Sequence, residues 1–314
     1  MMKSNRTAPL PLDACIGLTG RTLNGQYRIR SLLAQGGMGA IYEAEHVATG
    51  QRYALKALHA EAARRDEIAR RFEREAIAMQ RLAHPNIVAV LDVGAVEDGS
   101  LFLVMELVRG PTVRALIEAG PVRPRRALVI ARQVLEALAH AHAHEMVHRD
   151  LKPENVMLAT VGAPGHAYEQ AKLLDFGLVK LLGDAAAELG GDKITRTGIA
   201  SGTPAYMAPE QALGRKVDGR VDLYSLGITV FEMLTGVVPF RHADPLTLMR
   251  MQCAAPIPSL AKVAPGRPFL TPALEHLIAR ALAKQADERW DSAAHMIDAL
   301  DEAFRSLDHL PPEP

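Results

Sequence analysis

The sequence predicts an α+β protein with two lobes: a small, β-rich N-terminal lobe that contains one main helix, and a larger helical C-terminal lobe. Two observations support this prediction. In the first third of the 314-residue chain, apolar and polar residues alternate in several short runs, as they do in strands. From residue 108 onward, apolar residues recur at helical spacing instead. We expect the hinge between the lobes near residues 106–110, where one pattern replaces the other.

Alternation and turn residues predict five strands in the N-terminal lobe. They lie at 27–33, from 41 onward, and at 52–58, 87–93 and 101–107. A glycine-rich turn at 36–39 joins the first two strands, and a turn at 97–100 joins the last two. The main helix is expected between the third and fourth strands, at about 64–82.

Helical spacing predicts several helices in the C-terminal lobe. They are expected at 125–145 and near 222–235, 245–253, 271–284 and 291–305. We therefore expect one domain over residues 27–304, with an N-terminal lobe at about 27–108 and a C-terminal lobe at about 109–304. Residues 1–26 are expected to form a mobile tail, and residues 305–314 a C-terminal tail or the start of a linker.

Composition excludes several classes of function. Lys and Arg number 36, as do Asp and Glu, which argues against a nucleic-acid-binding protein. Cys15 and Cys253 are too few for a disulfide framework and fit a reducing compartment, so we expect a cytoplasmic location. The chain shows no signal peptide and no run of the roughly 18 apolar residues that a membrane helix needs. We expect a soluble chain without a membrane span.

The most informative motif is His-Arg-Asp-Leu-Lys-Pro-Glu-Asn at residues 148–155, followed by Asp-Phe-Gly at 175–177. These motifs supply two aspartates, a lysine and an asparagine. Phosphoryl transfer from a nucleotide needs such a set: a carboxylate that takes a hydroxyl proton, a cation near the moving phosphate, and oxygen ligands for magnesium. Each residue alone could serve as a loop cap, but the complete set predicts a phosphotransferase.

The two motifs resemble those of the protein kinase superfamily, whose bilobal fold agrees with the predicted organisation. Further motifs look like those of bacterial, eukaryotic-like (Hanks-type) serine/threonine kinases. They are Gly-Gly-Met-Gly at 36–39, His-Pro-Asn-Ile-Val at 84–88, Asp-Leu-Lys at 150–152 and Gly-Thr-Pro-Ala-Tyr-Met-Ala-Pro-Glu at 202–210. The resemblance covers about residues 27–304. It implies transfer of the γ-phosphate of ATP to serine and threonine hydroxyls of proteins.

The resemblance assigns roles to the residues of these motifs. Asp150 would accept the proton of the incoming hydroxyl, and Lys152 would neutralise charge on the γ-phosphate. Thr203 would bridge Asp150 and Lys152. Asn155 and Asp175 would hold Mg²⁺, with Mn²⁺ as a second possible ion.

A lysine and a glutamate of the N-terminal lobe are predicted to form an ion pair. Lys56 shares a strand face with Ala54, and a buried ammonium needs an anionic partner. Glu75 lies on the apolar face of the main helix with Phe72 and Met79. The alternative places Lys56 on the solvent face of an edge strand and Glu75 at the border of the apolar stripe. By resemblance, the pair would direct Lys56 at the α- and β-phosphates.

The resemblance also implies a nucleotide site. Met105 would be the gatekeeper, and Glu106 and Val108 would offer backbone groups to adenine. Ala34 replaces the first glycine of the family's phosphate-covering loop, and a left-handed φ there would cost about 1–2 kcal/mol. The complete set of expected nucleotide contacts is Leu33, Ala34, Gln35, Gly36, Gly37, Met38, Gly39, Ile41, Ala54, Lys56, Met105, Glu106, Val108 and Met157.

The resemblance also implies two structural contacts, and two segments of this chain differ from the usual pattern of the family. By resemblance, Glu210 would pair with Arg289, and Asp222 would fasten the catalytic loop from below. The segment at 159–171 is longer than usual in the family and is expected to be a surface loop, with a docking loop as the alternative. The segment at 183–193 lengthens the activation segment.

The activation segment, residues 175–210, carries Thr195 and Thr197. By resemblance, Arg149 and Lys180 would bind a phosphate there, so we expect autophosphorylation in trans to raise activity, through self-association of the chain. The other expected partners are protein substrates with serine or threonine. The alternatives are a catalytically impaired scaffold or nucleotide-binding signalling module with this fold, and a kinase that acts on a small molecule.

Overall fold

The computed structural model describes most of the chain, and the described residues form two compact units. The described residues are 17–36, 39–58, 72, 76–96, 100–163, 165–174, 176, 204–265 and 270–309. Within them, the first unit comprises the residues up to 80 and 89–107, and the second unit comprises the rest. The boundary after residue 107 lies within the predicted hinge. The first unit is rich in strands and the second in helices, which confirms the predicted fold class.

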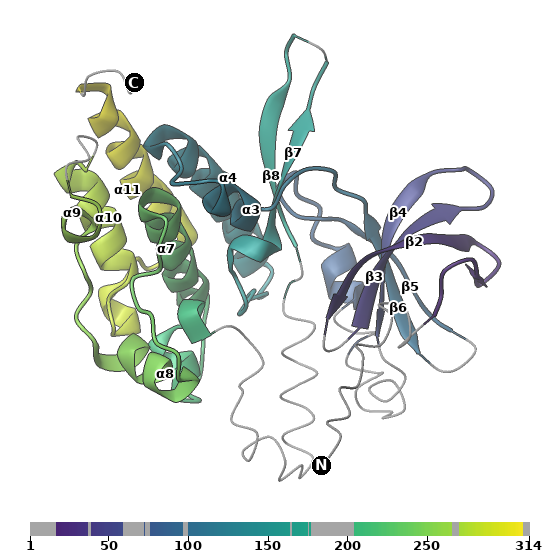
Figure 1. The fold of residues 1–314 in the computed structure, drawn as a ribbon, viewed down its shortest axis with the longest axis horizontal. Helices are drawn as coiled ribbons and strands as arrows, with labels where there is room; N and C mark the ends of the chain where they lie inside the picture. Colours follow the sequence, from purple (N-terminus) through teal and green to yellow (C-terminus); the bar gives the residue numbers. More distant parts are fainter. Residues whose placement is uncertain are drawn as a thin grey trace, which may run out of the picture. The chain divides into compact units, whose positions relative to one another are not determined.

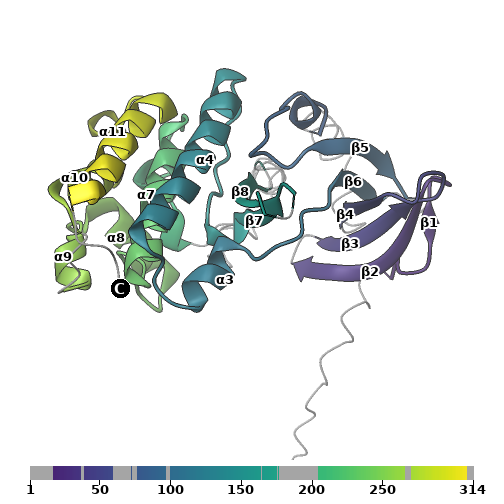
Figure 2. The same ribbon diagram turned by 90° about the horizontal axis from the view of Figure 1, so that it is seen from above.

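The first unit is built on one antiparallel sheet (Figure 1), and its strand order is β1-β2-β3-β4-β6-β5 (Figure 2). The strands are β1 Thr22–Leu23, β2 Tyr27–Gly36, β3 Gly39–His46, β4 Arg52–Leu58, β5 Val90–Ala95 and β6 Leu101–Glu106. Four of the five predicted strands are confirmed with small shifts at their ends. Of the helix expected at about 64–82, the described residues 72 and 76–80 are helical.

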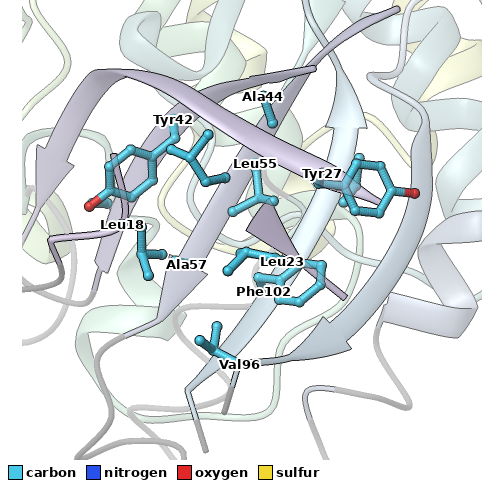
Figure 3. Packing of buried hydrophobic residues seen from close by; sticks show 12 residues of the cluster. Leu18, Leu23, Tyr27, Tyr42, Ala44, Leu55, Ala57, Val96 and Phe102 are labelled. Atoms are coloured by element: carbon cyan, nitrogen blue, oxygen red, sulfur yellow. The ribbon is translucent and has the colours of Figure 1, made fainter. Parts of the chain in front are cut away.

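One face of this sheet carries the core of the first unit (Figure 3). Leu55 and Ala57 of β4 and Phe102 of β6 are fully buried there. Because successive side chains of a strand point to opposite faces, Ala54 and Lys56 lie on the other face of β4. Residues 17–26, which were expected to belong to a mobile tail, include β1 and the buried Leu18.

The start of the strand predicted at 87–93 is wrong. Ile87 forms an isolated parallel bridge with Leu173, and the backbone N–H of Val88 donates to the Leu173 carbonyl at 3.0 Å. Asn86 Nδ2 donates to Gln133 Oε1 at 3.0 Å. These bonds attach residues 81–88 to the second unit, so β5 begins only at residue 90.

The second unit consists mainly of helices (Figure 2). The α-helices are α3 Val113–Glu118, α4 Pro124–Ala143, α6 Pro209–Ala212, α7 Arg220–Thr235, α8 Pro245–Ala254, α9 Leu260–Val263, α10 Pro272–Ala281 and α11 Ala293–Ser306. Short 3₁₀ helices lie at Pro153–Asn155, Pro204–Tyr206, Ala286–Glu288 and Leu307–His309. The predicted helices are thus confirmed, and that at 271–284 is shorter than expected. No described helix has both the length and the apolar character needed to cross a membrane.

Helix α7 is the centre of the second unit. Every residue from Val221 to Leu234 is buried, and α4 and α10 pack against it while α11 packs against both of them. A Cβ atom at Gly227 would lie 2.9 Å from the Cβ of Ala281, so only glycine lets α10 approach this closely. A helix buried all round can hold polar side chains only where they are hydrogen-bonded, and α7 holds several that reach the candidate site.

The prediction of a surface loop at 159–171 is wrong, because most of these residues belong to a long β-hairpin. Strand β7, Val156–Val161, pairs antiparallel with β8, Tyr168–Leu173, so residues 159–161 and 168–171 are paired strand. Gly162 and Gly165 have φ angles of 104° and 90°, which glycine adopts readily, and they lie in the turn of the hairpin.

Candidate active site

Three side chains of the predicted catalytic loop contact one another in the second unit. Lys152 Nζ donates to Asp150 Oδ2 at 2.8 Å. Asn155 Nδ2 donates to the backbone carbonyl of Asp150 at 2.8 Å and lies 3.4 Å from Asp150 Oδ2. The Asp150 side chain is 26% exposed, so an incoming group can reach the carboxylate while the loop fixes its orientation.

His148 joins this loop to the strand that precedes Asp175. The imidazole is fully buried. Its Nε2 lies 2.7 Å from the Leu174 carbonyl, and its Nδ1 lies 3.3 Å from the backbone nitrogen of Asp150. A carbonyl only accepts and a backbone N–H only donates, so Nε2 is the donor and Nδ1 the acceptor in these two bonds. No separate role for His148 was predicted from the sequence.

Asp222 fastens the loop from α7, as the resemblance implied. Its Oδ2 accepts the backbone N–H of His148 at 2.9 Å, and its Oδ1 accepts that of Arg149 at 2.8 Å. His142 Nε2 lies 2.8 Å from Oδ2. Arg149 has a φ of 64°, which is strained for a residue with a side chain. The two bonds to the buried carboxylate therefore stabilise the backbone conformation that presents Asp150.

Asn155 is connected to the residue before Asp175. The backbone N–H of Leu174 donates to the Asn155 carbonyl at 2.8 Å. Because Asn155 Nδ2 is bonded to Asp150, its Oδ1 is the amide atom left to accept or to bind a cation. Hard cations prefer amide and carboxylate oxygens, so this donor set fits Mg²⁺. Asp175 itself lies outside the described residues.

The segment after Thr203 is anchored to the helical unit by the predicted ion pair. The fully buried guanidinium of Arg289 donates to both oxygens of Glu210, at 2.7 Å each. Such bidentate pairs are strong and directional. Gln211 Nε2 donates to the Arg149 carbonyl at 3.0 Å, which links this segment directly to the catalytic loop.

A second network reaches the catalytic loop through Arg114 of α3. Arg114 donates to Glu232 Oε1 at 2.8 Å, to Glu154 Oε1 at 2.9 Å and to the Tyr206 hydroxyl. The Tyr206 hydroxyl donates to Glu232 Oε2 at 2.5 Å. Burial and the bond to Glu232 raise the pKa of Tyr206. Burial acts to lower the pKa of Arg114, but its bonds to Glu232 and Glu154 outweigh this and raise it.

In the first unit, Lys56 is buried in the middle of the sheet. It lies opposite Ile41 of β3 and Leu103 of β6, and it is 9% exposed. Since β4 is flanked on both sides by strands, the alternative of an exposed edge-strand lysine is wrong. Glu75 lies outside the described residues, so the predicted ion pair stays a prediction.

The replacement of glycine by Ala34 carries no backbone strain. Ala34 lies in β2, paired with Ile41, and it is not among the residues with positive φ. Gly39, by contrast, must be glycine, because a Cβ there would lie 2.1 Å from the Ala57 carbonyl oxygen.

The remaining expected nucleotide contacts are distributed over both units. Met105 and Glu106 end β6, opposite Ala54 and Tyr53 of β4. Met157 lies in β7 of the second unit. The expected residues outside the described part of the chain are Gly37, Met38, Glu75, Asp175, Lys180, Thr195, Thr197 and Thr203.

Comparison with known proteins gives one matching family model and many relatives. The family model described as "Protein kinase domain" matches residues 27–300. The serine/threonine-protein kinase pkn3 of Myxococcus xanthus is 36% identical over 93% of this chain and 53% of its own length. The serine/threonine-protein kinase PrkC of Bacillus subtilis is 36% identical over 91% of this chain and 42% of its own length. This chain thus spans about half the length of these relatives.

A solved structure extends the agreement to three dimensions. The kinase domain of PknI from Mycobacterium tuberculosis shares 29% identity with this chain and superimposes with a TM-score of 0.68. The alignment covers 91% of this chain and 98% of the PknI domain.

Proposed function

The chain belongs to the protein kinase family as a serine/threonine kinase domain of the bacterial type, and we propose that it is active, using ATP to phosphorylate serine and threonine hydroxyls of proteins. The observation that carries this proposal is the loop that holds Asp150, Lys152 and Asn155 together above Asp222. A scaffold protein without catalytic activity would not need these four side chains in this arrangement.

Asp150 and Lys152 act in the transfer step. The acceptor hydroxyl oxygen bonds to the γ-phosphorus as the bond from that phosphorus to the leaving ADP oxygen breaks, and the hydroxyl proton passes to the Asp150 carboxylate. Asn155 fixes the backbone of Asp150, so the carboxylate needs little reorientation when the acceptor arrives. The Lys152 ammonium, 2.8 Å from that carboxylate, is placed to offset negative charge on the phosphoryl oxygens.

The other residues hold the nucleotide. Lys56, in the predicted ion pair with Glu75, would position the α- and β-phosphates, and Asn155 and Asp175 would hold the Mg²⁺ or Mn²⁺ that offsets phosphate charge. The backbone at Glu106 and Val108 receives adenine. The burial of Lys56 on the sheet face opposite the core supports this assignment, because a buried ammonium has to meet anionic groups.

A transfer assay tests the proposal. The chain is incubated with Mg²⁺, γ-labelled ATP and a generic protein acceptor, and the labelled residues are identified after hydrolysis. We expect phosphoserine and phosphothreonine, and a loss of at least about 10²-fold in Lys56→Met, because this change removes charge at the phosphates. Lys56→Met should still unfold cooperatively. Label on tyrosine alone, no label, or an unchanged rate in Lys56→Met would contradict the proposal.

We further propose that autophosphorylation at Thr195 or Thr197, in trans, raises activity. A phosphate with a charge of about −1.5 to −2 would bond to Arg149 and Lys180. Asp222 accepts the backbone N–H of Arg149, and Gln211 donates to its backbone carbonyl. These two bonds hold the main chain from which the Arg149 side chain extends, which supports its proposed role.

Mass spectrometry with and without phosphatase treatment tests this regulation. We expect phosphate at one or both threonines, and reduced activity after phosphatase treatment and in the Thr195→Ala/Thr197→Ala double variant. Because the reaction is in trans, the rate of modification per molecule should rise with protein concentration. Fully active enzyme without modification at either residue would rule the switch out.

A further inference from the structure

Gln252 connects helix α8 to the turn that follows Thr203. Its side chain is fully buried. Its Nε2 donates to the carbonyl of Pro204 at 3.1 Å and to that of Ala205 at 2.7 Å. Its Oε1 accepts from the Tyr224 hydroxyl at 2.7 Å. Both N–H groups of the carboxamide are therefore used on two successive carbonyls.

The turn at 204–206 depends on these side-chain donors. Ser225 Oγ donates to the Tyr206 carbonyl at 2.8 Å, so three consecutive carbonyls receive a bond from α7 or α8. A 3₁₀ turn of this length has few backbone bonds of its own. The Pro204 carbonyl also accepts the backbone N–H of Met207 at 3.3 Å. A part-buried carbonyl that loses its donor is costly, so Gln252 and Ser225 stabilise the backbone shape of this turn beyond that bond.

The same turn is linked to the catalytic loop on both sides. Tyr206 contacts Arg114, which donates to Glu154 within the loop. After the turn, Gln211 donates to the carbonyl of Arg149, the neighbour of the proposed base. These links hold the turn beside the loop that carries Asp150. An acceptor whose hydroxyl reaches that base would therefore lie close to the turn, and a shift of the turn would change its position relative to the base. It would leave unchanged the strands of the first unit that carry Lys56.

Lys284 fixes the backbone from which Gln252 projects. Its Nζ donates to the carbonyls of Gln252 at 2.9 Å and Met251 at 3.4 Å, in the last turn of α8. The ammonium lies 4.0 Å from the centre of the Phe240 ring. With main chain and side chain both held, the carboxamide has a single position.

We propose that Gln252 is a positioning residue for the protein acceptor: its carboxamide holds the backbone of 204–205 in the shape on which the acceptor binds. The inference rests on the proposed kinase function, which supplies the acceptor. It predicts that Gln252 affects use of the acceptor and not use of ATP.

The test compares Gln252→Met with the unchanged chain. Methionine keeps the length and volume of the side chain but has no N–H donor. We expect the KM for the protein acceptor to rise roughly tenfold, the loss that one or two buried hydrogen bonds produce. We expect the KM for ATP, and the hydrolysis of ATP without acceptor, to stay within about twofold of the unchanged chain.

Two further variants guard against a general loss of stability. Thr271→Val removes a part-buried bond to Ser306 and the N-terminal cap of α10, neither of which contacts the turn at 204–206, and it should leave the acceptor KM unchanged. Tyr224→Phe removes the bond that orients the Gln252 carboxamide, together with the longer 3.5 Å bond from Lys284 Nζ to the same hydroxyl, and it should raise the acceptor KM by a smaller factor. It carries the test if Gln252→Met does not fold.

The outcomes separate the two proposals. If the unchanged chain labels no protein, the kinase function fails, whatever the variants do. If it labels protein and Gln252→Met keeps the original acceptor KM, the role of Gln252 is overturned. Equal losses of acceptor transfer and of ATP hydrolysis without acceptor would also overturn it, because they indicate a merely structural role.

Discussion

The strain at Arg149 explains why a fully buried carboxylate lies at Asp222. Each oxygen of Asp222 accepts a backbone N–H from the catalytic loop. Asparagine at this position has one acceptor oxygen, and its NH₂ would face the other N–H. We expect Asp222→Asn to lower the unfolding free energy by about 2–4 kcal/mol and to reduce turnover by at least about 10²-fold.

Urea unfolding and the transfer assay check this prediction, with Asp218→Asn as the matched control. Asp218 also accepts one backbone N–H, that of Arg220 at 2.9 Å, but it is near the surface. Its substitution should cost about 1 kcal/mol or less. If Asp222→Asn is as stable and as active as Asp218→Asn, the support of the loop by Asp222 is wrong.

Lys284 gives the chain a dependence of stability on pH. Burial lowers the pKa of Lys284 from 10.5 to about 8. Between these two pH values, the unfolded chain keeps the proton that the folded chain has lost, so folding stability from this group rises with pH. At about pH 7 and below, the group is almost fully protonated in both states and contributes almost no slope.

The measurement is the difference in unfolding free energy between the unchanged chain and Lys284→Met across this range. We expect the difference to move in favour of the unchanged chain from about pH 8 to about pH 10.5, and to be flat from about pH 6.5 to 7.5. A difference that stays constant or moves the other way at high pH would show that Lys284 keeps its proton.

Some single residues could be assigned from sequence and others could not. The contacts of Asp222, Glu210 and Arg289 were expected from the resemblance to protein kinases. Arg114 and Gln252 lie in no motif, and their partners are 118 and 48 positions away. Local sequence carries no signal of such contacts, because they form only when α3, α7 and α8 have packed.

At the scale of elements, the hairpin β7–β8 shows how composition misleads. Glycines and a proline at 162–165 indicate a turn, and parts of the short runs on either side were included in the loop. The two strands are held together by backbone hydrogen bonds. The side-chain pattern of a run this short gives only a weak signal of such pairing. Similarly, Ile87 fits the pattern of a strand of the first unit, but it pairs with Leu173 and belongs with that residue to the second unit.

The network around Arg114 ties α3, α7, the catalytic loop and the turn at 204–206 together, and it predicts non-additive effects. Arg114→Met alone leaves the 8%-exposed Glu232 carboxylate without its cation and should cost about 2–4 kcal/mol. Changing Glu232 to Met as well removes the buried charge. The double variant should therefore be more stable than the sum of the two single changes predicts.

A double-mutant cycle of unfolding free energies measures this coupling. The exposed pair of Arg125 and Asp308, 45% and 58% exposed, supplies the control cycle. We expect at least about 1 kcal/mol of coupling for Arg114 and Glu232, and about 0.5 kcal/mol or less for the exposed pair. Equal coupling in both cycles would mean that burial of the Arg114 network has no energetic role.

At the scale of the whole molecule, the fold class could be predicted because the two periodicities occupy separate parts of the chain. The strand period occupies the first third and the helical period the rest, and each part folds into its own unit. The exception, residues 81–88, follows a helix yet belongs to the second unit through Asn86 and Val88. The candidate site could be predicted for a different reason: most of its proposed catalytic and metal-binding residues lie in two short motifs, at 148–155 and 175–177.

Asp150→Asn tests the central claim, that this chain is a phosphotransferase in which Asp150 takes the hydroxyl proton. Transfer from ATP to a protein acceptor and binding of ATP with Mg²⁺ are measured on the same samples of variant and unchanged chain. We predict that transfer falls by about 10²-fold or more while the Kd for ATP stays within about threefold. Transfer at the original rate by Asp150→Asn would contradict the account.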